Sequence, residues 1–407
     1  MAKQTLDRLD MAGRRVLMRV DFNVPLDDDL NVTDDRRIRM ALPTIRCARE
    51  ARAKVILMSH LGRPKGKADP RLSLKPAALR LGELLETEVA VAPDCIGGEV
   101  AKVVDGMSDG DILVLENLRF HAGETENDPE FAKALASLAD LYVNDAFGTA
   151  HRKHASTYGV PSVMPEGTRA IGFLIQKELK FLGEALEDPE RPFVAVLGGA
   201  KVSDKIGVIE NLITKVDRLL IGGAMAYVFM AAQDRGVGKS KVEREVEKKG
   251  KTTDMLAVAA RLLEKIEAAD AEVLFPVDHL VAREPTAAAE TDIQSPDIDD
   301  GWMGLDIGPE TVEVYREKLA DAKTVVWNGP MGMFEVTPFA EGTRAVCEVM
   351  AQVDEVGTAI VGGGDTAAAV EKFGLAEQMT HISTGGGASL KFLEGKPFET
   401  IELIDEA

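Results

Sequence analysis

The chain has 407 residues, and its 48 lysine and arginine residues are outnumbered by 68 aspartate and glutamate residues, giving a formal net charge of -20. This length exceeds the size at which one hydrophobic core stops growing, so we expect two domains. The acidic balance argues against a nucleic-acid-binding protein, but it is compatible with a local basic cluster for an anionic substrate. The excess of acidic residues fits either adaptation to high salt or a simple gain in solubility. Thermal melting as a function of KCl would separate these two explanations.

The cysteines and the amino-terminal segment indicate a cytoplasmic protein. Cys47, Cys95 and Cys347 are far apart and form no Cys-x-x-Cys pair, which supports neither a zinc knuckle nor a disulfide framework. The opening MAKQTLDRLD is charged and lacks the apolar core of a signal peptide, and no apolar run is long enough to span a bilayer. We therefore expect a soluble, cytoplasmic protein that binds neither nucleic acid nor membrane.

The first half alternates short apolar runs with polar loops and helical segments, the pattern of a parallel sheet. Four expected strands, Arg15–Val20, Lys54–Met58, Ile112–Leu115 and Leu141–Val143, are each followed closely by arginine. Ligands of open parallel sheets bind outside the carboxyl ends of the strands. The planar guanidinium fork suits phosphate and carboxylate. We therefore expect one anionic molecule to be bound jointly by Arg37, Arg63, Arg119 and Arg152 with His60, His121 and His151.

The middle of the chain is expected to connect two lobes. Residues Ile171–Leu186 carry apolar positions at mixed three- and four-residue spacing, which predicts a helix. The segment Asp188–Pro192 then breaks this helix. A single connecting helix would allow the lobes to swing.

In the second half the strand ends carry glycine rather than arginine. The expected strands Phe193–Leu197, Arg218–Ile221, Thr324–Trp327, Thr358–Val361 and His381–Ser383 each lead into a glycine-containing loop. Main-chain amides at the start of a helix favour a bound phosphate. Two lysines, Lys201 and Lys205, are expected on one face of a helix start, either as charges for phosphate or as ordinary exposed lysines. Asp365 is the natural carboxylate for Mg²⁺, and it also fits a helix N-cap.

Two other nucleotide motifs are rejected. The sequence Gly238-Lys239-Ser240 resembles the end of a Walker A loop, but Gln233 stands where the first glycine belongs, and Met225–Ala232 reads as helix. A complete Gly-x-Gly-x-x-Gly after a strand, with an acidic residue beyond it, is absent from the sequence, which weakens a dinucleotide-dependent oxidoreductase.

Eight motifs in the chain resemble those of the phosphoglycerate kinase family. They occur in the family's order and span nearly the whole chain: RVDFNVP at Arg19–Pro25, SHLGRP at Ser59–Pro64, ENLRFH at Glu116–His121, NDAFGTAHR at Asn144–Arg152, GGAKVSDKI at Gly198–Ile206, WNGPMGMFE at Trp327–Glu335, GGGDT at Gly362–Thr366 and STGGGASL at Ser383–Leu390.

The resemblance implies an α/β fold of two Rossmann-like, three-layer lobes with parallel sheets. The expected organisation is a phosphoglycerate-binding domain over residues 1–172, a connecting helix over 173–190, a nucleotide-binding domain over 191–390, and a tail over 391–407 that returns to the first lobe. The family commonly has a third glycine where this chain has Ala224, whose methyl group would narrow the adenine pocket slightly.

By the same resemblance, two sets of residues take roles. The site for 3-phosphoglycerate or 1,3-bisphosphoglycerate comprises Asp21, Asn23, Arg37, His60, Leu61, Gly62, Arg63, Arg119 and Arg152. The site for ADP or ATP with Mg²⁺ comprises Gly199, Ala200, Lys201, Lys205, Gly223, Gly304, Asn328, Pro330, Glu335, Gly362, Gly363, Gly364, Asp365 and Thr366, with Asp365 as the metal ligand. Arg37 is preferred to Arg36 because it forms the Arg-Ile pair after Thr-Asp-Asp.

The expected reaction is reversible phosphoryl transfer between an acyl phosphate and ADP, which needs in-line alignment and neutralisation of negative charge. We assign the equatorial oxygens of the transferring group to Arg37 and Lys201, assisted by the amides around Gly363–Gly364 and Gly386–Gly387. Lobe closure is expected because water would compete in an open site. The alternatives are a non-catalytic sensor of nucleotide and sugar phosphate and a kinase that makes another acyl phosphate. We expect a monomer.

Overall fold

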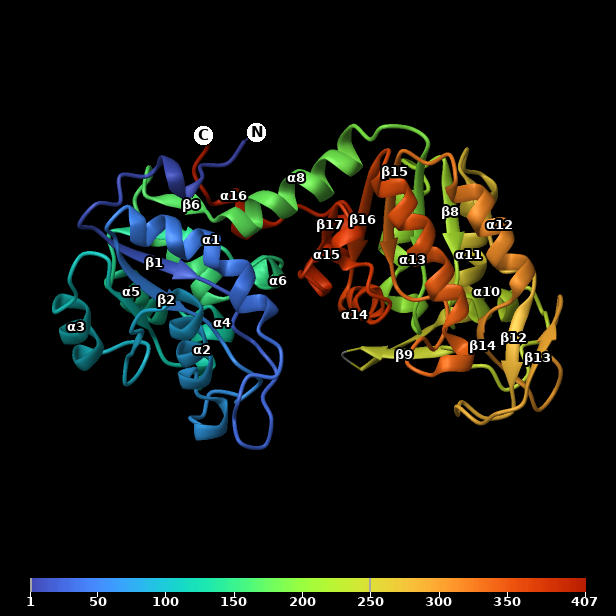
Figure 1. Ribbon diagram of the computed structural model, residues 1–407, viewed down its shortest axis with the longest axis horizontal. Helices are drawn as coiled ribbons and strands as arrows, with labels where there is room; N and C mark the ends of the chain where they lie inside the picture. Colours follow the sequence, from blue (N-terminus) through green and yellow to red (C-terminus); the bar gives the residue numbers. More distant parts are fainter. Residues whose placement is uncertain (1, 249) are drawn as a thin grey trace. The chain divides into compact units, whose positions relative to one another are not determined.

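The computed structural model describes residues 2–248 and 250–407 (Figure 1). The chain forms two compact units. One comprises Met1–Lys180 with Pro397–Ala407, and the other comprises Phe181–Lys396. Among the described residues, no helix is long and apolar enough to cross a membrane.

The first unit is built on a six-stranded parallel sheet in the order β3-β4-β2-β1-β5-β6. In β1, Val16 and Met18 pack into a core with residues of the covering helices, whereas Leu17, which alternates to the other face, is also fully buried. The sheet is therefore covered on both faces, as its apolar strands predict. The strands are β1 Arg15–Arg19, β2 Lys54–Met58, β3 Ala90–Val91, β4 Ile112–Val114, β5 Leu141–Asn144 and β6 Arg169–Ile171.

The helices of this unit cover the sheet with apolar faces. In α1, for example, Ile38, Ala41 and Ile45 recur at helical spacing and are buried. The helices are α1 Arg36–Glu50, α2 Lys75–Leu85, α3 Gly98–Asp105, α4 Ala122–Glu126, α5 Pro129–Ala136, α6 Phe147–Ala150, α7 Val160–Val163 and α16 Glu399–Glu402. Shorter helical turns are η1 Leu6–Arg8, η2 Pro70–Leu72, η3 Leu118–Phe120 and η4 Ala155–Gly159.

Both ends of the chain lie in the first unit, side by side (Figure 1). Lys3 forms an antiparallel bridge with Glu406, and its Nζ lies 2.7 Å from the Glu406 carboxylate. Asp405 accepts hydrogen bonds from the backbone N–H groups of Gly167 and Arg169, and its carboxylate also pairs with the Arg169 guanidinium. The last eleven residues are thus bound to the edge of the sheet at β6.

Helix α8, Phe173–Glu187, runs from the first unit into the second, since the division falls between Lys180 and Phe181. Its start is held by Asp145 at the end of β5, whose Oδ1 accepts hydrogen bonds from the N–H groups of Leu174 at 2.9 Å and Ile175 at 3.3 Å. These interactions satisfy amides that have no partner within the helix.

The second unit also has a six-stranded parallel sheet, in the order β11-β8-β7-β15-β16-β17. Trp327 and Val325 of β15 pack on α12 and α13, and Val326, on the opposite face, is fully buried as well. The strands are β7 Phe193–Leu197, β8 Arg218–Ile221, β11 Glu272–Leu274, β15 Thr324–Asn328, β16 Thr358–Gly362 and β17 His381–Ile382. The two units therefore have the expected three-layer α/β architecture.

The remaining elements of the second unit include two small antiparallel sheets that the sequence did not predict. These are the pair β9 Glu245–Lys248 and β10 Lys251–Asp254, and the set β12 His279–Ala282, β13 Thr291–Gln294 and β14 Met303–Ile307. The helices are α9 Ile206–Leu212, α10 Ala226–Ala232, α11 Met255–Glu267, α12 Pro309–Leu319, α13 Glu341–Asp354, α14 Gly364–Lys372 and α15 Gly387–Leu393, with short turns η5 Val202–Asp204, η6 Thr337–Phe339 and η7 Ala376–Gln378.

Candidate active site

In the first unit, the loop after β1 and the start of α1 form one side of a polar cluster. Arg37, in the first turn of α1, donates from Nη1 to Asp21 Oδ2 and to the carbonyl oxygen of Asn23, both at 3.1 Å. The side chain of Asn23 in turn accepts the N–H of Gly62 at 2.8 Å. Three loops named from the sequence are thus joined by hydrogen bonds, with the Arg37 side chain 37% exposed.

The loop after β4 contributes Arg119, which is nearly buried. Its Nη1 donates to the carbonyl oxygen of Gly62 at 2.8 Å, and its backbone N–H donates to Asn117 Oδ1 at 3.0 Å. The Asn117 amide also donates to the carbonyl oxygen of Leu61. The buried Nε of Arg119 has no hydrogen-bond partner among the described residues. A cation with a donor left over suits an anionic ligand.

His60 lies among four arginines. Its ring is buried, and its Nδ1 lies 3.0 Å from Nη2 of Arg19. Burial, followed by the charges of Arg19, Arg119, Arg37 and Arg152, lowers the pKa of His60 well below 6.5. The charges of three predicted arginines therefore act on this histidine, which is neutral at pH 7.

Arg19 is a component of this cluster that the sequence did not predict. It is completely buried at the end of β1, where Nε donates to Ser156 Oγ at 3.0 Å. Ser156 Oγ donates to the buried carboxylate of Glu124 at 2.7 Å. Its position as the last residue of an apolar strand could have indicated a role in the site. A charged residue at a strand end is, however, usually exposed, so the sequence alone favoured exposure.

Two of the predicted arginines, Arg152 and Arg63, are exposed. Arg152 donates from Nε to Nε2 of His151 at 3.0 Å. Its charge lowers the pKa of Arg119, to about 10, after the larger effects of burial and of Arg19. Arg63 lies on the same loop as Gly62 and is exposed.

His121 does not face this cluster, contrary to the expectation. Its Nε2 lies 2.7 Å from Oδ1 of Asp94, and its ring packs against Phe131 with centroids 5.4 Å apart. It follows Arg119 by two residues, and the η3 turn directs the two side chains to different partners. His121 belongs to a separate cluster.

In the second unit, the carboxyl ends of β7, β15, β16 and β17 surround a cavity of ≈ 370 Å³. Among the predicted nucleotide residues, those that line it are Gly199, Ala200, Lys201, Lys205, Asn328, Pro330, Gly363, Gly364, Asp365 and Thr366. Gly386, predicted as catalytic, lines it too. Gly387, whose amide was predicted to assist, lines it as well, and four lining residues were not predicted as site residues: Gly198, Asp204, Gly329 and Leu390.

The two predicted lysines differ in their surroundings. Lys205 is buried and donates from Nζ to Oδ1 of Asn328, and burial lowers its pKa to about 8 against the opposing charges of Asp204 and Asp365. Lys201 is exposed. The lysines flank the η5 turn and α9 begins only at Ile206, so the expectation that they share one face of a helix was wrong.

The glycine turns around the cavity require glycine for steric reasons. Gly329 has φ +101°, and a Cβ there would lie 2.2 Å from the carbonyl oxygen of Gly198. Its N–H donates to Thr366 Oγ1 at 2.7 Å, which connects the loop after β15 to the start of α14. The two backbones therefore approach each other at a distance that only glycine allows.

The start of α14 carries the predicted metal ligand. Gly363, with φ +93°, is the N-cap, so Asp365 lies inside the first turn and is not the cap. Asp365 is exposed and lines the cavity. The Asn328 Nδ2 is buried without a hydrogen-bond partner among the described residues. One exposed carboxylate beside phosphate-binding amides fits Mg²⁺, which keeps several waters and takes one or two carboxylates.

Four other predicted nucleotide residues do not line this cavity. Gly304 contacts the Tyr227 ring and donates its N–H to Ser240 Oγ at 2.9 Å. Glu335 is exposed, Gly362 is the buried last residue of β16, and Gly223 packs on Gly199 behind the cavity wall.

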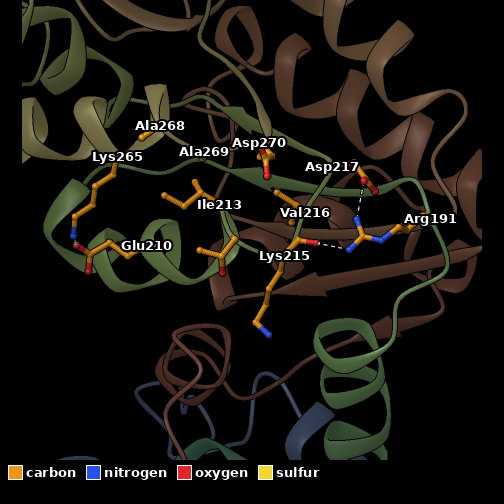
Figure 2. A pocket seen from close by; sticks show the side chains of 12 residues that line it. Arg191, Glu210, Ile213, Lys215, Val216, Asp217, Lys265, Ala268, Ala269 and Asp270 are labelled. Atoms are coloured by element: carbon orange, nitrogen blue, oxygen red, sulfur yellow. Dashed lines mark hydrogen bonds and ion pairs between the residues drawn. The ribbon is translucent and has the colours of Figure 1, made fainter.

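A larger cavity, of ≈ 690 Å³, lies at the opposite, amino-terminal ends of β7, β8 and β11 (Figure 2). Its charged side chains form pairs, with Arg191 2.7 Å from Asp217 and Lys265 2.5 Å from Glu210. No predicted site residue lines it. Size alone therefore does not locate the chemistry in this unit.

The chain has two three-layer units, one with clustered guanidinium groups and the other with a glycine-lined cavity and a buried lysine. This combination defines a phosphotransferase of the two-domain kinase class. A model of the phosphoglycerate kinase family matches residues 6–396. The chain therefore belongs to the phosphoglycerate kinase family, whose members transfer phosphoryl groups to a carboxyl-group acceptor.

Individual relatives agree over the full length. A phosphoglycerate kinase of an Anaeromyxobacter species is 57% identical over 408 residues, and one of Chlorobaculum tepidum is 53% identical over 408 residues, each alignment covering 100% of both chains. The solved structure of phosphoglycerate kinase from Coxiella burnetii is 39% identical, covers 98% of each chain and has a TM-score of 0.86.

Proposed function

We propose that this chain catalyses reversible phosphoryl transfer between 1,3-bisphosphoglycerate and ADP, giving 3-phosphoglycerate and ATP. The single observation that carries this assignment to residues is the hydrogen-bonded group that joins Arg37 and Arg119 through Asn23 and Gly62, on the loop that follows His60. Several guanidinium groups of the cluster have no carboxylate partner among the described residues. A ligand that carries both a phosphate and a carboxylate would supply the anionic groups that they bind.

In the first unit, the phosphoglycerate is bound by the hydrogen-bonded loops. Arg63, Arg119 and Arg152 hold its distal phosphate together with the neutral His60. Asp21 and Asn23 orient Arg37 through the hydrogen bonds at 3.1 Å, so that this guanidinium faces the reacting carboxyl end. Leu61 and Gly62 shape the wall of the site.

In the second unit, the nucleotide phosphates occupy the glycine-lined cavity. The buried Lys205 supplies positive charge, and the first amides of α14 supply donors to the phosphate oxygens. Asp365 holds Mg²⁺, which neutralises charge on the phosphates when bound. The adenosine extends toward Gly223, Gly304 and Glu335, which lie in the same unit outside the phosphate cavity.

During transfer, the protein mainly positions and neutralises. Arg37 and Lys201 stabilise the equatorial oxygens of the moving phosphoryl group, with help from the amides near Gly363 and Gly386. In-line transfer requires the two substrates to meet, so we propose that the units close during turnover. Small-angle scattering should detect compaction only with both substrates present; unchanged scattering would argue against closure.

The function is tested by a coupled assay in which the protein receives ATP, Mg²⁺ and 3-phosphoglycerate. A second enzyme reports the product that forms. We expect turnover with 3-phosphoglycerate, and none with acetate or glutamate, because only the first has a distal phosphate for the arginine cluster. Faster turnover with another carboxylate would assign the chain to a different acyl-phosphate-forming kinase. Nucleotide binding without turnover would favour a sensor. The monomeric state is a further prediction, which sedimentation equilibrium would check.

A further inference from the structure

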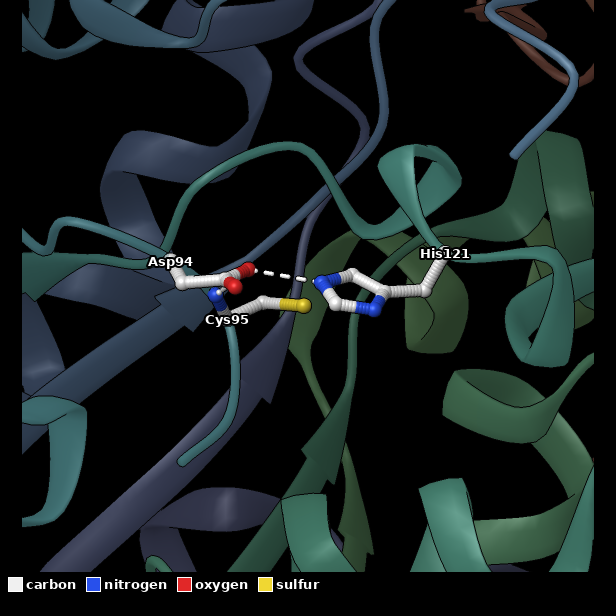
Figure 3. Close-up of side chains that lie close together, drawn as sticks. All are labelled: Asp94, Cys95 and His121. Carbon is white, nitrogen blue, oxygen red and sulfur yellow. Dashed lines mark hydrogen bonds and ion pairs between the residues drawn. The ribbon is translucent and has the colours of Figure 1, made fainter. Parts of the chain in front are cut away.

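A second cluster of chemically active side chains lies in the first unit, away from the arginines. Asp94 and Cys95, in the loop between β3 and α3, meet His121 at the start of α4. One potential ligand atom from each residue lies within 4.8 Å of the other two. Figure 3 shows the Sγ of Cys95 beneath the Asp94–His121 hydrogen bond and directed toward the His121 ring.

The three residues offer sulfur, nitrogen and oxygen to one point. A tetrahedral zinc ion has Zn–S distances of about 2.3 Å and Zn–N and Zn–O distances of about 2.0–2.2 Å, which place ligand atoms about 3.3–3.6 Å apart. The cluster reaches this range if the 2.7 Å contact between His121 and Asp94 opens slightly and the sulfur, which lies within 4.8 Å of the other two ligand atoms, moves closer to them. Side-chain rotations are sufficient for such a change, because Asp94 is 46% and His121 is 31% exposed.

The environment of the cluster favours a cation. An open concavity of ≈ 500 Å³ is lined by His121 and by the acidic residues Glu126, Asp128 and Glu130. The thiol of Cys95 is fully buried, so the sulfur is shielded from bulk oxidants while His121 and Asp94 reach solvent. Entry is therefore possible from the exposed side, where a fourth position can hold water.

We propose that Asp94, Cys95 and His121 form a binding site for a thiophilic divalent cation of the Zn²⁺ class. Thiolate and imidazole select such ions over Mg²⁺, which takes oxygen ligands. Binding exchanges the Cys95 thiol proton for the metal, while His121 ligates through an unprotonated ring nitrogen and keeps its proton on the other one, so metal uptake releases the thiol proton and strengthens as the pH rises. This site is independent of the Mg²⁺ site proposed at Asp365.

The competing explanation is that the Asp94–His121 hydrogen bond only orients the ring. The contact with Phe131 at 5.4 Å would then complete a structural role. That explanation leaves the sulfur between the two side chains without a function. It also predicts no metal affinity, which makes the two explanations separable.

The test uses the full-length protein, stripped of metal and titrated with Co²⁺ in excess Mg²⁺ so that oxygen sites stay filled. We expect one Co²⁺ per chain with a thiolate-to-cobalt charge-transfer band. Cys95→Ala should abolish the band, and His121→Gln should weaken Co²⁺ affinity by more than about 100-fold, beyond the loss of about 10–100-fold that is typical of outer-shell changes.

The matched control is Cys347→Ala, which removes another fully buried thiol, in the second unit. It should keep both the band and the affinity. Circular dichroism of each variant verifies folding. Zn²⁺ should displace Co²⁺ and raise the Tm of the wild-type protein and of Cys347→Ala, but not the Tm of Cys95→Ala. Absence of the band in the wild type, or its persistence in Cys95→Ala, overturns the proposal.

Discussion

The guanidinium of Arg19 lies 3.0 Å from Nδ1 of His60, with both side chains buried beneath the arginine cluster. A protonated imidazole in this position would place a second positive charge against the first. His60 therefore serves the site as a neutral group. Because His60 is held neutral in the folded protein, it is expected to lower the folding stability at low pH.

We predict that His60 contributes stability that is lost as the pH drops below about 6.5. The folded protein holds the pKa of His60 well below 6.5, so below this pH the unfolded chain binds more protons, and the stability is lost with slopes of up to about 1.4 kcal/mol per pH unit. Urea unfolding between pH 7 and pH 5 measures the slope. His60→Gln should reduce it but not remove it, because the pKa of His154 is also lowered, to about 4. An unchanged slope would contradict the role of His60.

Arg37→Ala should lower turnover by about 10³–10⁵-fold, the contribution of arginines in related phosphoryl transfers. Nucleotide affinity should be unchanged, because Arg37 bonds only to groups of the first unit. The control is Arg36→Ala, since Arg36 pairs with Asp34 and is 47% exposed. Steady-state kinetics with titration calorimetry distinguish the two; a larger loss in Arg36→Ala would reverse the assignment.

Lys205 should make nucleotide binding depend on pH. Its pKa in the free protein is lowered to about 8, and an anionic nucleotide favours the charged form, so affinity should fall as the pH rises from 7.5 to 9. In the absence of ligand, stability should rise over the same range, because the unfolded lysine still binds its proton. Calorimetry of ADP binding checks the first effect. Lys205→Met should bind weakly at every pH, and a persistent pH dependence in that variant would implicate another group.

Gly363→Ala should reduce stability and nucleotide affinity. At φ +93° an added methyl group is strained by about 1–3 kcal/mol, and it would come within 3.2 Å of Asn328 Nδ2. Gly364→Ala is the matched control, because that position is helical and a Cβ there meets nothing within 4 Å. Thermal melting should separate the two variants, and equal Tm values would show that the turn relaxes.

Most strands of the two parallel sheets could be predicted because buried strands are apolar, and the grouping of arginines could be predicted because the carboxyl ends of such strands meet at one edge. The short edge strands β3 and β6 of the first sheet were not predicted. The sheet of β12, β13 and β14 could not, since exposed residues such as those of Thr291–Gln294 show no apolar alternation. Arg19 was missed because its burial depends on Ser156 and His60, which come from distant loops. His121 was misplaced because one turn of η3 decides its direction.

The pairing of Lys3 with Glu406 and of Arg169 with Asp405 sets an order of assembly on the ribosome. All of Phe181–Lys396 must be synthesised before Pro397–Ala407 emerge to join the unit that began the chain. The first-made unit is therefore the last to be completed, and a chain that stopped at Lys396 would contain all of the second unit but only part of the first.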